Sequence, residues 1–189
     1  TGLNVDTASG GELAVALAAG VDPARIALHG NNKSAAELEL ALRVGVGRIV
    51  VDSLAEIELL SGLARDRGTR APVMIRVTPG VHASTHEFIA TAHEDQKFGL
   101  SLNPARDGED SPALTAVAAC LEASDALDLR GLHCHIGSQI FAAEGFGQAA
   151  ERVLALREAV AARWDVVLPE VDLGGGHGVA YTAEDAPRE

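Results

Sequence analysis

Three consecutive glycines stand directly after a short apolar run, Val171 to Leu173, which has the composition of a strand. Glycine is favoured where the backbone needs a positive φ or must approach a ligand closely, because it otherwise costs conformational entropy on folding. Bare N–H groups at the carboxyl end of a strand most often bind a phosphate group. Gly174, Gly175 and Gly176 therefore predict a phosphate-binding segment, although the run lacks the G-x-G-x-x-G spacing of a dinucleotide site.

Two groups of histidines could bind a metal. His133 and His135 share one face of a predicted strand while Cys134 points to the other, but no third ligand follows at a suitable spacing. The second group lies in the polar segment 81–97, which is longer than an ordinary connection. It comprises His82, His86, His93, Glu87, Glu94 and Asp95. Its spacing matches no zinc motif, so we favour a solvated loop and keep a metal hydrolase as an alternative.

Lys33 is a candidate nucleophile, because a lysine just past a strand can be desolvated and form an imine with a carbonyl compound. It stands at a predicted helix start beside Asn31, Asn32 and Ser34. Exposure to solvent is the default at such a position. We therefore expect Lys33 to be exposed and to have no catalytic role.

The elements that must position these residues alternate between strands and helices. We expect strands over residues 3–6, 26–28, 49–51, 73–77, 98–100, 129–135 and 171–173, and helices that begin near Ser9, Ser34 and Leu54 and run through 114–121 and 146–160. Ser-x-x-Glu capping boxes at Ser9 and Ser34 support the first two helices. This alternation is typical of a parallel α/β architecture. A closed (β/α)8 TIM-type barrel usually takes about 250 residues, so the sequence predicts an incomplete barrel of about six to seven βα units.

Polar residues gather at the predicted carboxyl ends of the strands, where such a barrel carries its chemistry. They are Asp6, His29, Asn31, Asp52, Arg76, His135, Ser138 and the three glycines. Simpler explanations exist for each, and for Asp52 we favour a helix N-cap. The coincidence of the whole set predicts a site at this end of the barrel.

Charge and composition exclude several classes of partner. The 189 residues carry a net charge of −12 and no Lys/Arg-rich run, which argues against nucleic acid or an anionic membrane surface. No apolar run is long enough to span a bilayer. Cys120 and Cys134 lie in unlike contexts, which favours reduced thiols of a cytoplasmic protein. The sequence opens at Thr1 inside a predicted strand, so we expect a part of a longer protein.

Five motifs in the same order along the chain resemble those of the fold-type III pyridoxal-phosphate decarboxylases, and within them the diaminopimelate decarboxylase family. They are residues 6–13 (DTASGGEL), 29–34 (HGNNKS), 86–100 (HEF to DQKFGL), 133–139 (HCHIGSQ) and 171–176 (VDLGGG). The resemblance covers nearly the whole chain. It implies a pyridoxal-phosphate-binding barrel over residues 1–189 that decarboxylates meso-2,6-diaminopimelate to L-lysine and CO2, with a small amino acid as substrate.

The resemblance also implies a role for each predicted site residue. His135 stacks on the ring of pyridoxal 5'-phosphate, and Ser138 with Gly174, Gly175 and Gly176 holds its phosphate. Asp6 lines the cofactor pocket near the imine, and Arg76 lies near the ring or contributes charge to the pocket. These seven residues form the predicted cofactor site, and the resemblance assigns no metal.

The expected catalytic parts are missing from this sequence. The family's imine-forming lysine lies on the first barrel strand in a Tyr/Phe-Ala-x-Lys context, which does not occur here, and Lys33 belongs to a different motif. The acidic partner of the pyridine nitrogen and the carboxyl-terminal β-domain, which completes the partner subunit's site in a homodimer, are also absent. We therefore expect the 189 residues alone to be inactive.

Other functions stay open at this point. An ornithine, arginine or carboxynorspermidine decarboxylase is the nearest alternative, and the match over 86–100 disfavours it. A racemase with the same barrel is more remote. A non-catalytic pyridoxal-phosphate-binding barrel is the alternative from another class. The resemblance gives no role for His177, which replaces a residue that is usually aliphatic in the family.

Overall fold

The computed structural model describes residues 2–81 and 98–182. In chain order the elements are β1 Val5–Thr7, α1 Gly10–Ala18, a 3-10 turn Pro23–Arg25, β2 Ile26–Leu28, α2 Ala35–Val44, β3 Arg48–Val51, α3 Leu54–Asp66, β4 Ala71–Thr78, β5 Leu100–Ser101, α4 Pro112–Glu122, β6 Leu127–His133, α5 Glu144–Trp164 and β7 Glu170–Asp172. The predicted alternation of strands and helices is confirmed.

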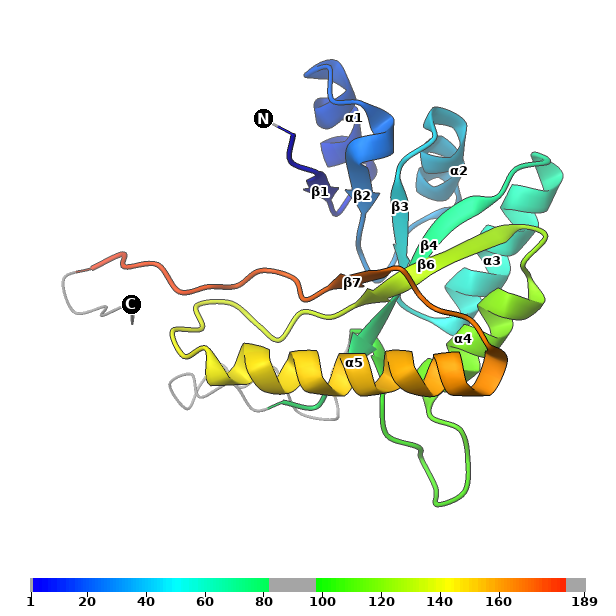
Figure 1. Cartoon of the computed structure of the whole chain (residues 1–189). Helices are drawn as coiled ribbons and strands as arrows, with labels where there is room; N and C mark the ends of the chain where they lie inside the picture. The colour runs from blue at the N-terminus through cyan, green and yellow to red at the C-terminus, as the bar shows by residue number, and fades with distance from the viewer. Residues whose placement is uncertain (1, 82–97, 183–189) are drawn as a thin grey trace.

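The strands form one parallel sheet in the order β1-β2-β3-β4-β6-β7, and the short β5 pairs with the end of β4. The sheet curls, and the helices lie on its outer side with α5 running along one flank (Figure 1). Within the described residues the sheet does not close, because β1 and β7 each pair with one neighbour only. The predicted incomplete (β/α)8 barrel is therefore confirmed.

Serine side chains begin most of the helices. Ser34 forms a full capping box: its hydroxyl accepts from the Glu37 N–H while the Glu37 carboxylate accepts from the Ser34 N–H. Ser9 also caps its helix, but the Glu12 carboxylate accepts from the Ala8 N–H, one residue earlier than a box requires. Such caps satisfy N–H groups that have no partner inside the helix.

The prediction that Asp52 caps a helix is wrong. Ser53 occupies the N-cap of α3, and its hydroxyl accepts from the Glu56 N–H. Asp52 is buried and instead accepts a hydrogen bond from the Gly99 N–H. Ser53 is the cap because it stands directly before the first helical residue. The Asp52 carboxylate is therefore not needed as a cap and bonds to another segment of the chain.

The core lies between the sheet and the helices. One apolar cluster joins strand residues such as Leu28, Ile49 and Ile75 to helix residues such as Leu38 and Leu60, all essentially inaccessible to solvent. Burial of each large aliphatic side chain contributes about 1.5–3 kcal/mol. This packing holds the carboxyl ends of the strands in fixed relation to one another.

An ion-pair network connects strands across the amino-terminal end of the sheet. Glu170, the first residue of β7, contacts both Arg48 on β3 and Arg130 on β6. Because β4 and β6 lie between β3 and β7 in the sheet, the Arg48–Glu170 contact spans the inside of the curl. Residues at this end of a barrel serve stability rather than chemistry.

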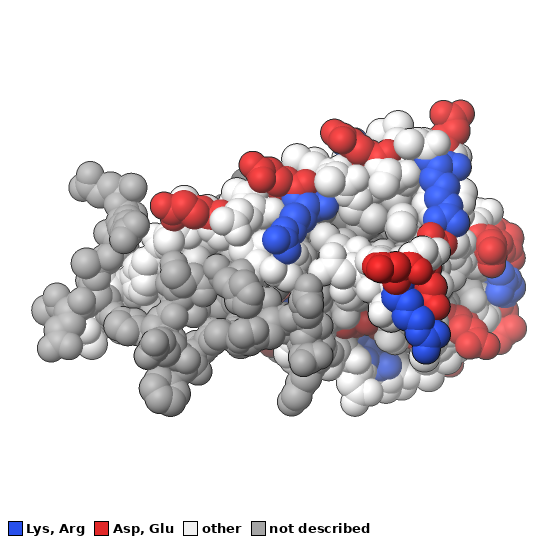
Figure 2. Space-filling view, turned by 90° about the horizontal axis from the view of Figure 1, so that it is seen from below, with Lys and Arg blue, Asp and Glu red and all other residues white. Residues whose placement is uncertain are grey.

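The surface carries mixed charge. Figure 2 shows Lys and Arg side chains next to Asp and Glu side chains on the face that it presents, with no broad area of basic residues alone. Within the described residues, no helix is long and apolar enough to cross a membrane.

Candidate functional site

The glycine run follows β7, and at two of its positions the backbone conformation requires glycine. Gly174 and Gly176 have φ angles of +71° and +104°, in the region that disfavours side chains. A Cβ atom on Gly176 would stand 1.9 Å from the Gly137 carbonyl oxygen, and one on Gly174 would stand 2.6 Å from the Cys134 carbonyl oxygen. A Cβ atom on Gly175 would meet nothing within 4 Å. Gly175 therefore faces open space, while its neighbours pack against the segment that follows β6.

Hydrogen bonds identify which N–H groups can bind a ligand. The Gly174 N–H donates to Asp172 Oδ1 at 2.8 Å. The Gly175 and Gly176 N–H groups have no acceptor within the described part of the chain. Backbone donors are normally paired, so two adjacent free donors at a strand end favour an anionic ligand. The candidate anion site therefore has fewer N–H donors than the sequence predicted, since the Gly174 N–H already donates to Asp172.

Two segments meet to form this site. The Ile140 N–H donates to the Gly176 carbonyl at 2.9 Å, and the Gly178 N–H donates to the Ile140 carbonyl at 2.9 Å. The Gln139 side chain accepts a hydrogen bond from the Val179 N–H at 3.0 Å and donates one to the Val179 carbonyl at 3.2 Å. The segment after β6 is thus bonded along the glycine run, which keeps the two segments in register.

His135 and Ser138 lie on the segment after β6, because β6 ends at His133 and not at residue 135 as predicted. The His135 ring lies against the glycine run: if Gly174 had a Cβ atom, that atom would lie 2.9 Å from His135 Nδ1. Burial lowers the pKa of His135, and the positive charge of Arg76 lowers it further. Its imidazole is therefore neutral near pH 7. Ser138 is exposed and follows Gly137, the residue that touches Gly176.

Two histidine–carboxylate pairs line the inside of the barrel. His29 Nε2 lies 3.4 Å from Asp6 Oδ1, and His133 Nδ1 lies 3.0 Å from Asp172 Oδ2. The two imidazole rings touch edge to face, with centroids 4.8 Å apart. The nearby His29 imidazole lowers the pKa of Asp6, although partial burial opposes this. Four strand ends are thereby joined through one polar layer.

Arg76, on β4, also points into this end of the barrel. Its Nη1 atom lies 3.6 Å from Asp52 Oδ2, and its guanidinium stands over the Phe98 ring at 5.0 Å from the centroid. The Asp52 carboxylate is almost fully buried, so Arg76 supplies the positive charge that it needs. Arg76 thus lies with the predicted site residues, as part of a charge pair that the sequence did not predict.

The prediction that Lys33 is exposed is wrong. Its side chain is 2% exposed, and Nζ lies 2.7 Å from Glu56 Oε1. Nζ also donates to the carbonyls of Gly30 and Val50. The Lys33 Nζ atom therefore contacts three acceptors, which indicates a structural role for this side chain.

The described residues offer no metal site. No group of three or more His, Cys, Asp or Glu side chains within them is arranged to hold a metal ion. Burial raises the pKa of the Cys134 thiol to about 12, so it remains protonated. The group comprising His82, His86, His93, Glu87, Glu94 and Asp95 lies outside the described residues.

The structure shows what the side chain of His177 contacts. Its ring stacks on Phe146 of α5, with centroids 4.4 Å apart and an angle of 23° between the planes. Such contacts between aromatic rings contribute about 0.5–1.5 kcal/mol beyond the area that they bury. His177 therefore fastens the end of the glycine run to the helix that follows β6.

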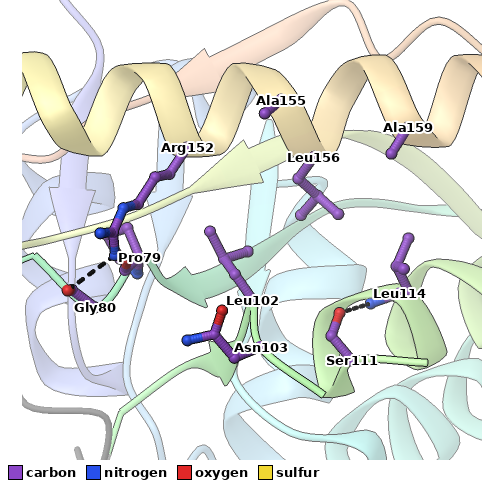
Figure 3. Close-up of a pocket in the computed structure, with 10 residues that line it drawn as sticks. All are labelled: Pro79, Gly80, Leu102, Asn103, Ser111, Leu114, Arg152, Ala155, Leu156 and Ala159. Carbon is purple, nitrogen blue, oxygen red and sulfur yellow. Dashed lines mark hydrogen bonds between the residues drawn. The ribbon is translucent and has the colours of Figure 1, made fainter. Parts of the chain in front are cut away.

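A pocket of about 600 Å³ lies elsewhere, between α4, α5 and the end of β4 (Figure 3). Arg152 reaches across it and donates to the carbonyls of Pro79 and Gly80. Much of its remaining wall consists of the apolar side chains of Leu102, Leu114 and Leu156. The pocket shares no residue with the predicted site, and its one cation is already paired with backbone.

The sequence prediction does not include the two contacts of the Asp172 carboxylate, with the Gly174 N–H and with His133. It treated Asp172 only as part of a strand, although aspartate is depleted in strands and commonly accepts from the N–H two residues later. That spacing, Asp172 followed by Gly174, was the available signal. The spacing of His29 and His133 in the sequence does not predict that their rings touch.

These features define the class of the protein. It is a parallel α/β barrel protein with polar side chains gathered at the carboxyl ends of its strands and a backbone segment after β7 that is suited to an anion. The family model for the pyridoxal-dependent decarboxylase, pyridoxal binding domain, matches residues 1–189. The chain belongs to this family.

Similar proteins agree with this assignment. The chain is 50% identical over 186 residues to a diaminopimelate decarboxylase of Corynebacterium efficiens and 52% identical over 190 residues to one of Mycobacterium leprae. Each match covers 98% of this chain and 39% of the relative, so the chain spans about two fifths of the length of these proteins. A solved diaminopimelate decarboxylase from M. jannaschii in complex with L-lysine superposes with a TM-score of 0.84 at 30% identity, over 96% of this chain and 40% of that one. The enzyme from Helicobacter pylori complexed with L-lysine gives 0.82 at 32% identity, over 96% and 44%.

Proposed function

We propose that this chain is the cofactor-holding part of a decarboxylase that uses pyridoxal 5'-phosphate to convert meso-2,6-diaminopimelate to L-lysine and CO2. The observation that carries the proposal is the pair of free N–H groups of Gly175 and Gly176 beside His135 and Ser138. The identity of about 50% to diaminopimelate decarboxylases over nearly the whole chain supports the substrate.

The residues present fit the cofactor. The Gly175 and Gly176 N–H groups and the Ser138 hydroxyl are the donors for its phosphate, and Gly175 leaves room for close approach. The neutral imidazole of His135 lies against the glycine run, where it can pack on the pyridine ring. When bound, pyridoxal phosphate accepts the electrons that the departing carboxylate leaves behind.

Asp6 and Arg76 supply charge of both signs at the same end of the barrel. The Asp6 side chain is 72% exposed, so it remains accessible to a ligand, and its Oδ1 atom lies 3.4 Å from His29 Nε2. Arg76 is held by Asp52 and keeps the surroundings of His135 positive, which disfavours protonation of that ring. Both residues orient and balance charge rather than form bonds.

The imine-forming lysine belongs, in this proposal, to the part of the protein outside these residues. Lys33 is unsuited to that role because its Nζ atom is engaged by Glu56 and two carbonyls. The proposal extends the resemblance: residues 1–189 form part of the pyridoxal-phosphate-binding barrel, a β-domain follows, and the protein acts in the cytoplasm as a homodimer whose sites draw on both subunits.

The nearest alternative is a decarboxylase of another basic amino acid. A lysine/ornithine decarboxylase from Vibrio vulnificus superposes with a TM-score of 0.70 at 25% identity, below the values for the diaminopimelate decarboxylases. This difference supports diaminopimelate as the substrate of the present protein.

Product analysis tests the proposal. The purified full-length protein, supplied with pyridoxal 5'-phosphate, is incubated separately with meso-diaminopimelate, ornithine, arginine and lysine. We expect L-lysine and CO2 from meso-diaminopimelate and little reaction with the others. Turnover of ornithine or arginine without turnover of meso-diaminopimelate would contradict the proposed substrate, and failure to bind the cofactor would contradict the whole proposal.

A further inference from the structure

Asp172 connects the inside of the barrel to the glycine run. It is the last residue of β7, and its two carboxylate oxygens have different partners. Oδ1 accepts the Gly174 N–H at 2.8 Å, and Oδ2 lies 3.0 Å from Nδ1 of His133 on β6. A third contact, from the Cys134 N–H to the Asp172 carbonyl at 2.9 Å, continues the pairing of the two strands. Asp172 therefore binds both the neighbouring strand and the turn that follows its own.

The bond to Gly174 sets the direction of the next two N–H groups. With the Gly174 N–H donating to the carboxylate, the backbone at Gly174 takes a φ of +71°. The Gly175 and Gly176 N–H groups that follow are left without acceptors among the described residues. A side chain that accepts from the N–H two residues later stabilises such a turn locally.

The carboxylate is held in its charged form. Partial burial acts to raise the pKa of Asp172, but the contacts with His133 and the Gly174 N–H outweigh it and lower the pKa to about 2. The His133 side chain is only 5% exposed and its ring is fixed against His29, so Asp172 has a rigid partner. A charged acceptor also makes a stronger hydrogen bond than a neutral one.

We propose that Asp172 is a positioning residue for phosphate binding, which fixes the Gly174 turn against His133 and so aims the Gly175 and Gly176 N–H groups at the ligand. Asp172 does not touch the phosphate itself. This inference rests on the proposed function, because it assumes that the ligand of the two N–H groups is the phosphate of pyridoxal 5'-phosphate.

The test compares two ligands that differ only in the phosphate. Dissociation constants for pyridoxal 5'-phosphate and for pyridoxal are measured with the full-length apoprotein, as wild type and as Asp172→Asn, Asp172→Ser and Asp172→Ala. Asp125→Ala is the matched control, because it removes an aspartate that pairs with Arg65 and takes no part in the site.

We expect Asp172→Ala to weaken binding of pyridoxal 5'-phosphate about tenfold, the equivalent of one hydrogen bond to a charged group, and to change pyridoxal binding less than about twofold. Asn retains an acceptor for the Gly174 N–H and should stay within about threefold of wild type, while Ser, a weaker acceptor, should fall between Asn and Ala. The Asp125→Ala control should leave both constants unchanged.

Equal losses for both ligands would overturn the inference, because they would indicate a general structural role. Unchanged binding of both ligands by Asp172→Ala would overturn it as well. If Asp172→Ala does not fold, the contrast between the Asn and Ser variants provides the same comparison. Failure of the wild type to bind pyridoxal 5'-phosphate would instead contradict the proposed function, so the two failures are distinguishable.

Discussion

Substitution of alanine at Gly176 should destabilise the protein strongly, whereas the same substitution at Gly175 should not destabilise it. The two residues are adjacent and the chemical change is the same, but their surroundings differ. At Gly176 the new methyl group would stand 1.9 Å from the Gly137 carbonyl oxygen, at a φ of +104°. At Gly175 it would meet no atom within 4 Å, and φ lies outside the positive region.

The expected magnitude follows from these contacts. A positive φ costs a residue with a Cβ atom about 1–2 kcal/mol. Relief of the overlap requires the glycine run to move away from Gly137, at a cost of about 1–3 kcal/mol for overpacking. That movement also weakens the hydrogen bond from the Ile140 N–H to the Gly176 carbonyl, worth about 1 kcal/mol. We therefore expect Gly176→Ala to lose about 3–6 kcal/mol, a large part of the about 5–15 kcal/mol that stabilises a typical domain.

Gly175→Ala should be neutral or slightly stabilising, because alanine restricts the unfolded chain by about 0.4–1 kcal/mol without strain in the folded state. The assay is urea unfolding of the full-length apoprotein, so that bound cofactor does not contribute to stability. Equal urea midpoints for Gly175→Ala and Gly176→Ala would refute the claim that close packing of the backbone requires glycine at 176.

Three further substitutions test other parts of the structure. Lys33→Met should lower the thermal unfolding temperature sharply, since an unpaired buried Glu56 costs about 3–5 kcal/mol. Adding Glu56→Gln to this variant should recover most of the lost stability. If the double variant recovers none of it, the pairing of Lys33 with Glu56 is contradicted. Asp172 has a pKa of about 2 against an ordinary 3.8, so its carboxylate stabilises the fold above about pH 4. The stability difference between wild type and Asp172→Asn should therefore shrink as the pH falls from about 4 towards 2, and a constant difference would contradict this. His177→Ala should lower the free energy of unfolding in urea by about 1 kcal/mol. In the Phe146→Leu background the same substitution should lower it by almost nothing, and a double-mutant cycle measures this difference.

Local sequence patterns predicted most of the fold. The spacing of apolar residues located the strands and helices, and the serine at position 34 with Glu37 predicted a capping box that the structure contains. The strand predicted over 129–135 ends at His133 instead, because its partner β7 ends at Asp172, the residue paired with His133. Strand ends depend on the partner strand, which local sequence does not contain.

The site was predicted less completely, for the same physical reason. Lys33 is expected at the surface because its sequence neighbours are polar, yet its side chain is buried and contacts Glu56 on the distant helix α3. Asp52 was expected to cap a helix, yet the Gly99 N–H and Arg76 approach it from other segments. In both cases the decisive contact joins residues that are distant in sequence.

The most direct test of the account is a crystal structure of the full-length protein with pyridoxal 5'-phosphate. The account predicts phosphate oxygens within hydrogen-bond distance of the Gly175 and Gly176 N–H groups and the Ser138 hydroxyl, with the His135 ring against the pyridine ring. It also predicts that the Gly174 N–H stays bonded to Asp172 Oδ1. A phosphate bound at any other place in the barrel, or held by the Gly174 N–H with Asp172 displaced, would contradict the central claim.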